Sequence, residues 1–410
     1  DGTEGPVAPS VRVINLSIGD PYRQFLQSMS PVARLLDWLS LTYGVLFVVS
    51  AGNQSDAIQL GISRTEFESS DPQEQEVAVV KALFSDARNR KLLSPAESIN
   101  GLTVGSVQYD SSHFGVINNR FNPFLQFLPS PVSAFGSGYR RAIKPDIVFP
   151  GGRVLYQEDL RSSRRDNYVI KPVEPSIRNT PPGNKTAIPA RQSGSLEGIA
   201  YSCGTSNAAA LMSRAAGICY DSLQQIFAEQ ATDVDARACE APLLKAMLVH
   251  GCAWGDIGTQ IGDLLRTPEN NRQISGLVSR WMGYGVPQVD RVLDCTEQRA
   301  SLLGFGQLLD GEAHVFRLPL PLCSSACFCR RLLMRTTSSA IGQAMYSMQL
   351  SAIRPARSGK AVAGRGSCPA AARPCLRGPS EAAITMCSPG PLTRTKAASS
   401  IFRAILPSAL

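Results

Sequence analysis

The chain has 410 residues, with 41 Lys and Arg against 33 Asp and Glu, which gives a formal net charge of +8. After residue 320 there are twelve basic residues and a single acidic residue, Glu381. The first 320 residues therefore have a net charge of −3. This distribution argues against a basic nucleic-acid surface on the main domain. The most apolar stretch, residues 45–51, is far too short to cross a bilayer, and no membrane contact is predicted.

The N-terminal part predicts a strand, a helix and a second strand. Residues 11–18, "VRVINLSI", alternate and are β-branched, which indicates a buried strand. Helical spacing after Pro31 predicts a helix within 24–43, and Gly44 ends it. Residues 45–51, "VLFVVSA", are continuously apolar, which is typical of a parallel strand covered on both faces. This βαβ order predicts an α/β fold with a doubly wound, mostly parallel sheet.

The rest of the main domain continues this pattern around one irregular segment. Residues 153–198 are rich in Arg, Ser, Pro and Asn without a period, which predicts a surface insertion. The other expected elements, in chain order, are strands at 101–108 and 144–152, helices at 204–227 and 241–254, a glycine-broken turn into a short helix at 280–294, and a strand at 313–321.

The end of the chain differs in composition from the main domain. We expect residues 301–321 to begin a β-sandwich-like appendage and residues 322–410 to form a low-order basic tail. The tail has almost no acidic residues, yet it carries six cysteines and aliphatic islands, which disordered tails rarely combine. Our hypothesis is that a shifted reading frame of GC-rich DNA produces this composition. Translation of the other frames tests it.

Ser206 is the first candidate functional residue. It lies in "YSCGTSNAAALM" (201–212), at the expected start of an alanine-rich helix. The free N–H groups and the dipole of a helix N-terminus stabilise an oxyanion, and Gly204 allows a substrate to approach the backbone. Serine is also a preferred helix cap, so this stretch alone is equally consistent with a purely structural role.

Asn53 is the second candidate, because it follows a buried strand in "VVSAGNQSD" (48–56). The carboxyl end of a parallel strand is where such sheets bind ligands. The amide N–H of an asparagine at this place can reach a developing oxyanion. Taken alone, the motif favours the simpler interpretation that Asn53 is a turn residue after Gly52.

Together with "NLSIGD" (15–20) and "KPDIVFPG" (144–151), these two motifs resemble the subtilisin-like serine proteases, the subtilase or peptidase S8 family. "GTSNAAALM" is similar to the family's nucleophile motif Gly-Thr-Ser-Met-Ala-Ala-Pro. The resemblance covers about residues 11–295 and implies a subtilisin-type peptidase domain over residues 1–300. It also implies a serine-type endopeptidase that acts on polypeptide substrates.

The resemblance assigns a role to each matching residue. It makes Ser206 the nucleophile, and it makes the Asn53 side chain and the Ser206 N–H the oxyanion hole. The residues that it places along the substrate cleft are Ser17, Ile18 and Gly19 on one side and Ser50, Ala51 and Gly52 on the other.

The chain departs from the family pattern in three ways. Asn207 stands where the family has Met, and Ala210 stands where it has Pro, but neither position touches the reacting atoms. The catalytic Asp and His of the family precede the segment that "NLSIGD" matches, and the sixteen residues before Ser17 contain no histidine. We therefore expect the chain to lack the N-terminal Asp/His segment and to have negligible peptidase activity alone.

Other sources of a base are less well supported. We interpret His113, His250 and His314 as ordinary surface or core histidines. An α/β-hydrolase, in which the histidine follows the serine, requires Gly-x-Ser-x-Gly at a strand-to-helix elbow. Here the sequence is Gly-Thr-Ser-Asn-Ala, and we expect no strand close before it, so we reject that fold.

A non-catalytic, subtilase-like peptide-binding module remains the alternative. Nucleic-acid binding would depend on the suspect tail, and the "CSSACFC" run at 323–329 has no second ligand pair at zinc-type spacing. We therefore predict no metal and no cofactor. Five scattered cysteines in the first 320 residues slightly favour a cytoplasmic over a secreted location.

Overall fold

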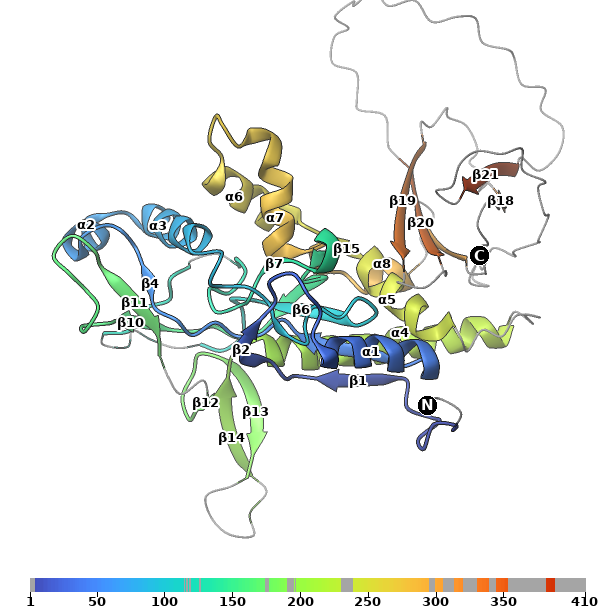
Figure 1. The fold of residues 1–410 in the computed structure, drawn as a ribbon, viewed down its shortest axis with the longest axis horizontal. Coiled ribbons are helices and arrows are strands. Elements are labelled where there is room, and N and C mark those ends of the chain that lie inside the picture. Colours follow the sequence, from blue (N-terminus) through green and yellow to red (C-terminus); the bar gives the residue numbers. More distant parts are fainter. Residues whose placement is uncertain are drawn as a thin grey trace, which may run out of the picture. The chain divides into compact units, whose positions relative to one another are not determined.

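A computed structural model describes most of the chain and divides it into two units, residues 1–292 and 293–410. Figure 1 shows the elements in chain order. The described residues are 4–113, 115, 117, 119–124, 127–173, 177–189, 195, 197–229, 239–294, 299–304, 313–319, 330–338, 344–352 and 381–387.

The first unit is built on a four-stranded parallel sheet. The strands are β1 (Val13–Leu16), β3 (Leu46–Ser50), β6 (Leu102–Val107) and β9 (Ile147–Pro150), and they lie in this order across the sheet. All three neighbouring pairs are parallel. The prediction of an α/β fold with a parallel sheet is therefore confirmed, and each strand lies within its predicted range.

Helices cover both faces of this sheet. All five residues of β3 are buried, which requires cover on both sides because successive side chains point to opposite faces. On one face, Phe47 and Val49 pack in a cluster with Leu36 of α1 (Pro31–Tyr43). The long helix α4 (Thr205–Glu229) packs along all four strands, and α5 (Glu240–His250) packs beside it.

Local chemistry explains the bounds of α1. The side chain of Ser30 accepts a hydrogen bond from the backbone N–H of Ala33, which caps the helix, and Pro31 occupies the first turn. Gly44 adopts a left-handed conformation with φ 64° and ends the helix. The helix start at Pro31 and the stop at Gly44 are as the sequence predicts.

Four helices have no counterpart in the sequence predictions, and one predicted helix is too long. The unpredicted helices are α2 (Arg64–Ser69), α3 (Pro72–Ser85), α6 (Gly255–Leu265) and α7 (Ile274–Met282). The helix expected at 241–254 ends at His250, because β15 (Cys252–Ala253) turns back to pair with β16 (Val286–Pro287). The short helix that ends the first unit is α8 (Asp290–Leu293).

The prediction of a surface insertion at 153–198 is wrong for part of that segment. Strands β10 (Tyr156–Glu158) and β11 (Val169–Pro172) form an antiparallel sheet with β4 (Ile58–Gln59). Tyr156 and Ile170 are buried in a core cluster with residues of α3, α6 and α7. The strands are too short for a sequence period, and their pairing partner lies about a hundred residues earlier in the chain.

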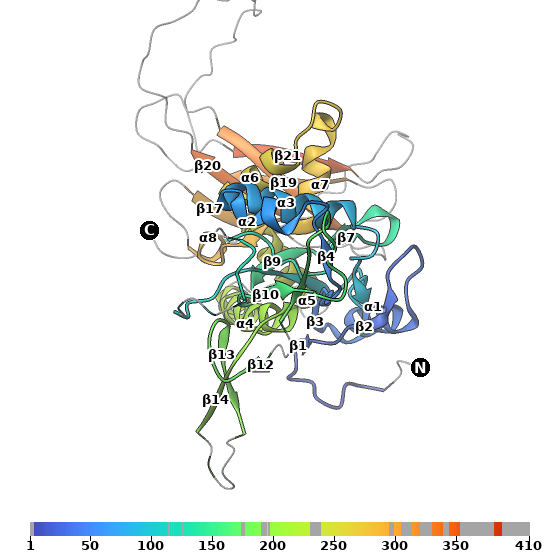
Figure 2. The same cartoon turned by 90° about the vertical axis from the view of Figure 1, so that its left-hand side faces the viewer.

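A second antiparallel sheet of this segment adjoins the candidate nucleophile. It consists of β12 (Ile177–Arg178), β14 (Gly198–Ser202) and β13 (Asn184–Ile188), in that order. The β13–β14 hairpin extends away from the body of the first unit in both views (Figures 1 and 2).

Two further pairs of short strands complete the first unit. One pair is β2 (Asp20–Gln24) with β5 (Leu93–Ser94), and the other is β7 (Gly136–Ser137) with β8 (Ile143–Lys144). In the part of the chain that the structure describes, no helix has the length and apolarity needed to cross a membrane.

From residue 299 onward, the described residues of the second unit are all in strands. The strand order in one antiparallel sheet is β17 (Arg299–Gly304), β20 (Ala344–Ala352) and β19 (Arg330–Ser338), while β18 (Ala313–Pro319) pairs with β21 (Glu381–Cys387). Most of the predicted tail at 322–410 lies outside the described residues, and the reading-frame hypothesis stays a prediction.

Candidate active site

The candidate site lies at the carboxyl edge of the parallel sheet, where α4 begins. The backbone N–H of Gly204 donates to the carbonyl oxygen of Gly151, just after β9, at 2.8 Å. The hydroxyl of Ser17, just after β1, donates to the carbonyl oxygen of Ser206 at 3.3 Å. Segments that follow the first and last strands of the sheet thus contact the start of α4, which is the place where parallel sheets bind ligands.

Asn53 is fixed in orientation by Thr205. The Oδ1 atom of Asn53 accepts hydrogen bonds from the backbone N–H of Thr205 at 2.9 Å and from its Oγ1 at 3.0 Å. A backbone N–H can only donate, so the atom that faces it must be the amide oxygen rather than the amide nitrogen. Among the described residues, no hydrogen bond occupies the Nδ2 of Asn53, which lies beside Gly204 just before α4, so its donors could reach an oxyanion there.

Gly204 provides the space for this arrangement. Its φ of +128° is a conformation that other residues rarely adopt. A Cβ atom at this position would lie 2.8 Å from the Nδ2 atom of Asn53. Glycine is therefore required both for the backbone conformation and for the close approach of the amide.

The segment that carries Asn53 is held on both sides. Its neighbours donate and accept backbone hydrogen bonds: Gln54 N–H donates to Val132, and Gly52 accepts from Ala134. The buried guanidinium of Arg90 donates to the carbonyl oxygen of Asp56 at 3.1 Å. The position of the Asn53 backbone therefore depends on residues that are far away in sequence.

Ser206 is the second residue of α4 and is half-buried. At this position its backbone N–H has no acceptor within the helix, so it can donate to a ligand. In the described residues, no hydrogen bond occupies the Ser206 hydroxyl. The next residue, Asn207, is hydrogen-bonded to Ser202. Its Nδ2 donates to the Ser202 hydroxyl at 2.9 Å, and its Oδ1 accepts from that hydroxyl at 3.1 Å.

The expectation that no strand precedes Ser206 is wrong. Strand β14 ends at Ser202, only four residues before it. This strand belongs to an antiparallel hairpin and not to the parallel sheet, whereas the α/β-hydrolase elbow joins a strand of the central sheet to its helix. The reason for rejecting that fold therefore changes from a missing strand to a strand in another sheet.

The two predicted sides of the substrate cleft lie next to each other. Ile18 is exposed, whereas Ser50 and Ala51 are buried. A Cβ atom at Gly19 would lie 3.6 Å from the Cα atom of Gly52, so the two segments approach closely. Whether these residues bind substrate stays a prediction.

Leu93 is a neighbour of this cleft that the sequence analysis did not identify. It is buried, and its Cβ atom would lie 3.1 Å from a Cβ at Gly19 and 2.6 Å from a Cβ at Gly52. Its N–H donates to the carbonyl oxygen of Ala51 at 3.0 Å. No local motif marks this leucine, because the pairing of β2 with β5 brings it to the site.

No described histidine is hydrogen-bonded to Ser206. His113 is exposed in the loop after β6, His250 is buried at the end of α5, and His314 lies on β18 in the second unit. A search of the described residues also finds no group of three or more His, Cys, Asp or Glu side chains that could hold a metal ion.

An ion pair stabilises the loop beside His113. The guanidinium of Arg153 donates to both carboxylate oxygens of Asp110, at 2.8 and 3.0 Å. Burial alone would raise the pKa of Asp110, but hydrogen bonds from Arg153 and Ser112 outweigh it and lower the pKa to about 2. Asp110 is therefore ionised and engaged at neutral pH, and it supports this loop rather than acting as a proton donor.

Residues 4–285 match the sequence profile of the Subtilase family, peptidase S8. The chain belongs to the subtilase family. The match includes Asn53 and Ser206 and ends just before the last short helix of the first unit. Membership supports a serine-type peptidase at the level of the family, and the resemblance stated from the motifs is confirmed.

One curated relative also matches part of the chain. It is an uncharacterized protein, y4bN, of Sinorhizobium fredii (strain NBRC 101917 / NGR234), and it is 32% identical over 151 residues. The matched segment spans 35% of this chain and about a third of the relative, 32% of its length. The name of that protein records no activity, so this similarity adds no substrate or partner.

Proposed function

We propose that this subtilase chain carries the nucleophile and the oxyanion hole of a serine endopeptidase. Ser206 would attack the scissile carbonyl, and the Nδ2 of Asn53 and the N–H of Ser206 would hold the oxyanion. The observation that carries the proposal is the pair of hydrogen bonds from Thr205 to the Oδ1 of Asn53, which turns the amide nitrogen toward Gly204, two residues before Ser206.

The proposal also assigns the general base to a residue outside the present sequence. Neither His113 nor His250 is hydrogen-bonded to Ser206, and a serine hydroxyl is a weak nucleophile until a base removes its proton. The resemblance to the family implies a histidine and an aspartate in a segment that precedes "NLSIGD". Without them, the oxyanion hole and the substrate cleft remain, but the large rate factor of the triad is lost.

A fluorophosphonate probe tests the assignment of the base. We expect no rapid labelling of Ser206 in this chain, with the Ser206→Ala variant as the blank. Rapid labelling of Ser206 that is absent in the variant would contradict the missing base, because it would require an activating group within these 410 residues.

The genomic region upstream, read in all three frames, tests the peptidase assignment itself. We expect an in-frame Asp-Ser/Thr-Gly motif followed by a His-Gly-Thr motif. When that longer chain is expressed, peptide hydrolysis should fall about 100- to 1,000-fold in the Asn53→Ala variant, the usual effect of losing one oxyanion donor. An upstream region without either motif would favour the non-catalytic peptide-binding module instead.

A further inference from the structure

A pocket of about 490 Å³ lies in the first unit between the β7–β8 hairpin and helix α7. It is at the amino edge of the parallel sheet: Lys144 precedes β9, and its Nζ atom contacts the carbonyl oxygen of Gly101, just before β6. The candidate active site occupies the carboxyl edge, beyond the other end of β9. The pocket is therefore separate from the site built around Ser206.

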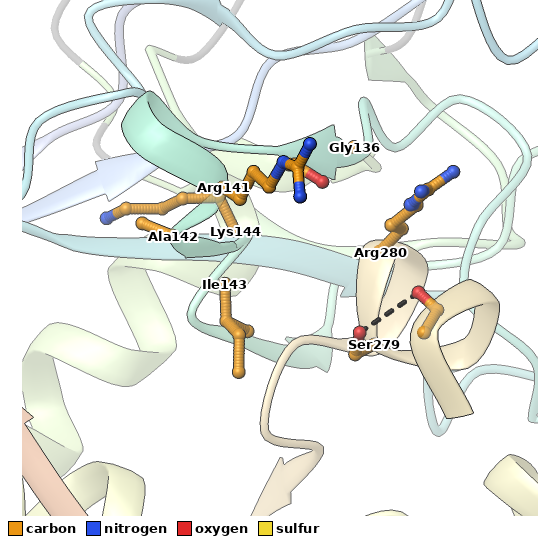
Figure 3. A pocket seen from close by; sticks show the side chains of 9 residues that line it. Gly136, Arg141, Ala142, Ile143, Lys144, Ser279 and Arg280 are labelled. Carbon is orange, nitrogen blue, oxygen red and sulfur yellow. Dashed lines mark hydrogen bonds between the residues drawn. The ribbon is translucent and has the colours of Figure 1, made fainter. Parts of the chain in front are cut away.

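Two arginines make this pocket positively charged. Arg141 from the hairpin and Arg280 from α7 both line it, and no acidic residue does. Within the described part of the chain, neither guanidinium forms an ion pair. Figure 3 shows Arg141 on the hairpin and Arg280 on helix α7. The third cation, Lys144, is buried and bonded to Asp146 at 2.5 Å, so only its side-chain stem borders the space.

The backbone that presents Arg141 is strained. Arg140 and Arg141 both have positive φ, at 51° and 65°, in the turn that joins β7 to β8. Hairpin turns of this kind strongly favour Asn-Gly, because other residues are destabilised in the left-handed region. Arg140 is stabilised by its position over the ring of Tyr139, 5.4 Å from the ring centroid. Arg141 is exposed, and no such ring contact is found for it among the described residues.

The walls of the pocket leave room for a ligand. At Gly136 and at Gly276, an added Cβ atom would meet no other atom within 4 Å. Ile143, which is 36% exposed, provides an apolar surface beside the arginines. The volume lies in the range of small-molecule sites, which combine apolar surface with a few polar groups that fix orientation.

We propose that this pocket binds a small molecule with two negative charges, whose anionic oxygens bind Arg141 and Arg280 and whose apolar part packs against Ile143. A guanidinium group can donate two parallel hydrogen bonds to two oxygens of one phosphate or carboxylate group. A phosphate ester and a dicarboxylate could therefore both bind the two arginines. The turn places Arg141 in the pocket that Arg280 also lines, so that a bound anion would be attracted by both side chains.

Calorimetric titration of the full chain tests the proposal, with inorganic phosphate in one arm and succinate in the other. Sodium chloride keeps the ionic strength constant, so that general screening does not contribute. We expect saturable binding in at least one arm, which identifies the type of anion. The loss of one charged hydrogen-bonding partner, in Arg141→Gly or Arg280→Ser, should weaken the binding about tenfold or more.

Two variants separate this effect from a change in the fold. Arg140→Asn relieves strain in the same turn but leaves Arg141 in the pocket, so binding should stay within about twofold of the original. Arg272→Ser removes an exposed arginine just before α7 that does not line the pocket, and it should also bind normally. Arg141→Gly should be at least as stable as the original chain, because glycine adopts positive φ without strain.

A third variant blocks the space without removing a charge. Gly276→Leu places a side chain where the pocket is open, and its helical position accepts leucine well. It should abolish binding while both arginines remain. The proposal is overturned if neither anion binds, if Arg141→Gly retains full affinity, or if Arg272→Ser weakens binding as much as Arg141→Gly does.

Discussion

The two edges of the parallel sheet use polar groups in opposite ways. At the amino edge, Lys144, Asp146 and Lys245 are enclosed and bonded to each other and to the backbone. At the carboxyl edge, Asn53 is exposed and Ser206 half-buried, and donors of both are available to a ligand. The difference shows that the buried ion cluster at the amino edge supports the fold, while the polar groups at the carboxyl edge leave hydrogen-bond donors exposed.

The electrostatics of the amino edge fit a structural role. Burial lowers the pKa of Lys144 to about 8, although Asp146 opposes the shift. Burial alone would raise the pKa of Asp146, but the two lysines outweigh it and lower that pKa. Each charge is tolerated in the interior only because its partners are present.

The largest expected effect is therefore at the amino edge. Asp146→Ala would leave two lysines without their shared carboxylate, and we expect it to lower the free energy of unfolding by about 3–5 kcal/mol. Urea denaturation measures this. Asp159→Ala is the matched control, because its partner Lys171 is 41% exposed, and it should destabilise the chain much less than Asp146→Ala does. Equal losses in the two variants would contradict the contrast between the buried and exposed pairs.

The next effect concerns the glycine at the carboxyl edge. Gly204→Ala forces an unsuitable residue to φ +128° against Asn53, and we expect a loss of about 1–3 kcal/mol. Gly217→Ala serves as the control, because a Cβ there meets nothing within 4 Å in the interior of α4. That variant should gain up to about 1 kcal/mol. Thermal or urea unfolding measures the two changes in stability, which we expect to have opposite signs. If both variants were more stable than the original chain, the space beside Asn53 would not be needed.

Protonation of Asp110 in acid should lower the free energy of unfolding. Its pKa is about 2 in the folded chain, below the ordinary value of 3.8, so its contribution is present above about pH 4 and is lost as the pH falls to about 2. The difference corresponds to about 2 kcal/mol. Urea unfolding between about pH 2 and pH 6 should show a shallower decline for Asp110→Asn than for the original chain. Parallel pH curves for the two proteins would show that the Arg153 pair contributes nothing.

The smallest effect concerns the hydrogen bonds that orient Asn53. Thr205→Val removes the bond from Oγ1 to the Oδ1 of Asn53 but keeps the backbone bond, so we expect a loss of about 1 kcal/mol. Thr205→Ser retains a hydroxyl and should lose less in the same denaturation experiment. If the serine variant is the weaker of the two, the side-chain bond is not what stabilises this turn.

The sheet and its first helix were predictable because their signals are local. The apolar run that contains β3 is continuous because both of its faces are buried, and Pro31 and Gly44 mark the ends of α1 by their own backbone preferences. Strands β10 and β11 were not predictable in the same way. They have three and four residues, too few for a visible period, and they become strands only by pairing with each other and with Ile58.

In the candidate site, too, some features could be predicted from local sequence and others could not. The motifs around Asn53 and Ser206 identify both residues, because helix ends and strand ends have recognisable sequences. The contact that orients the amide joins Asn53 to a residue 152 positions away, and Leu93 reaches the cleft only through the pairing of β5. The two arginines of the pocket at the amino edge likewise come from segments far apart in the sequence, Arg141 from a hairpin and Arg280 from α7.

By itself, the sequence determined the parallel α/β architecture, the family and the two residues on which the proposed chemistry depends. These follow from periodicity, caps and motifs, whose physical causes act over a few neighbouring residues. Only the tertiary structure decided which way the Asn53 amide faces, which polar groups are buried and paired, and where two unpaired arginines share a pocket. Those features depend on packing between distant segments, and hydrogen-bond direction and burial exist only once that packing has formed.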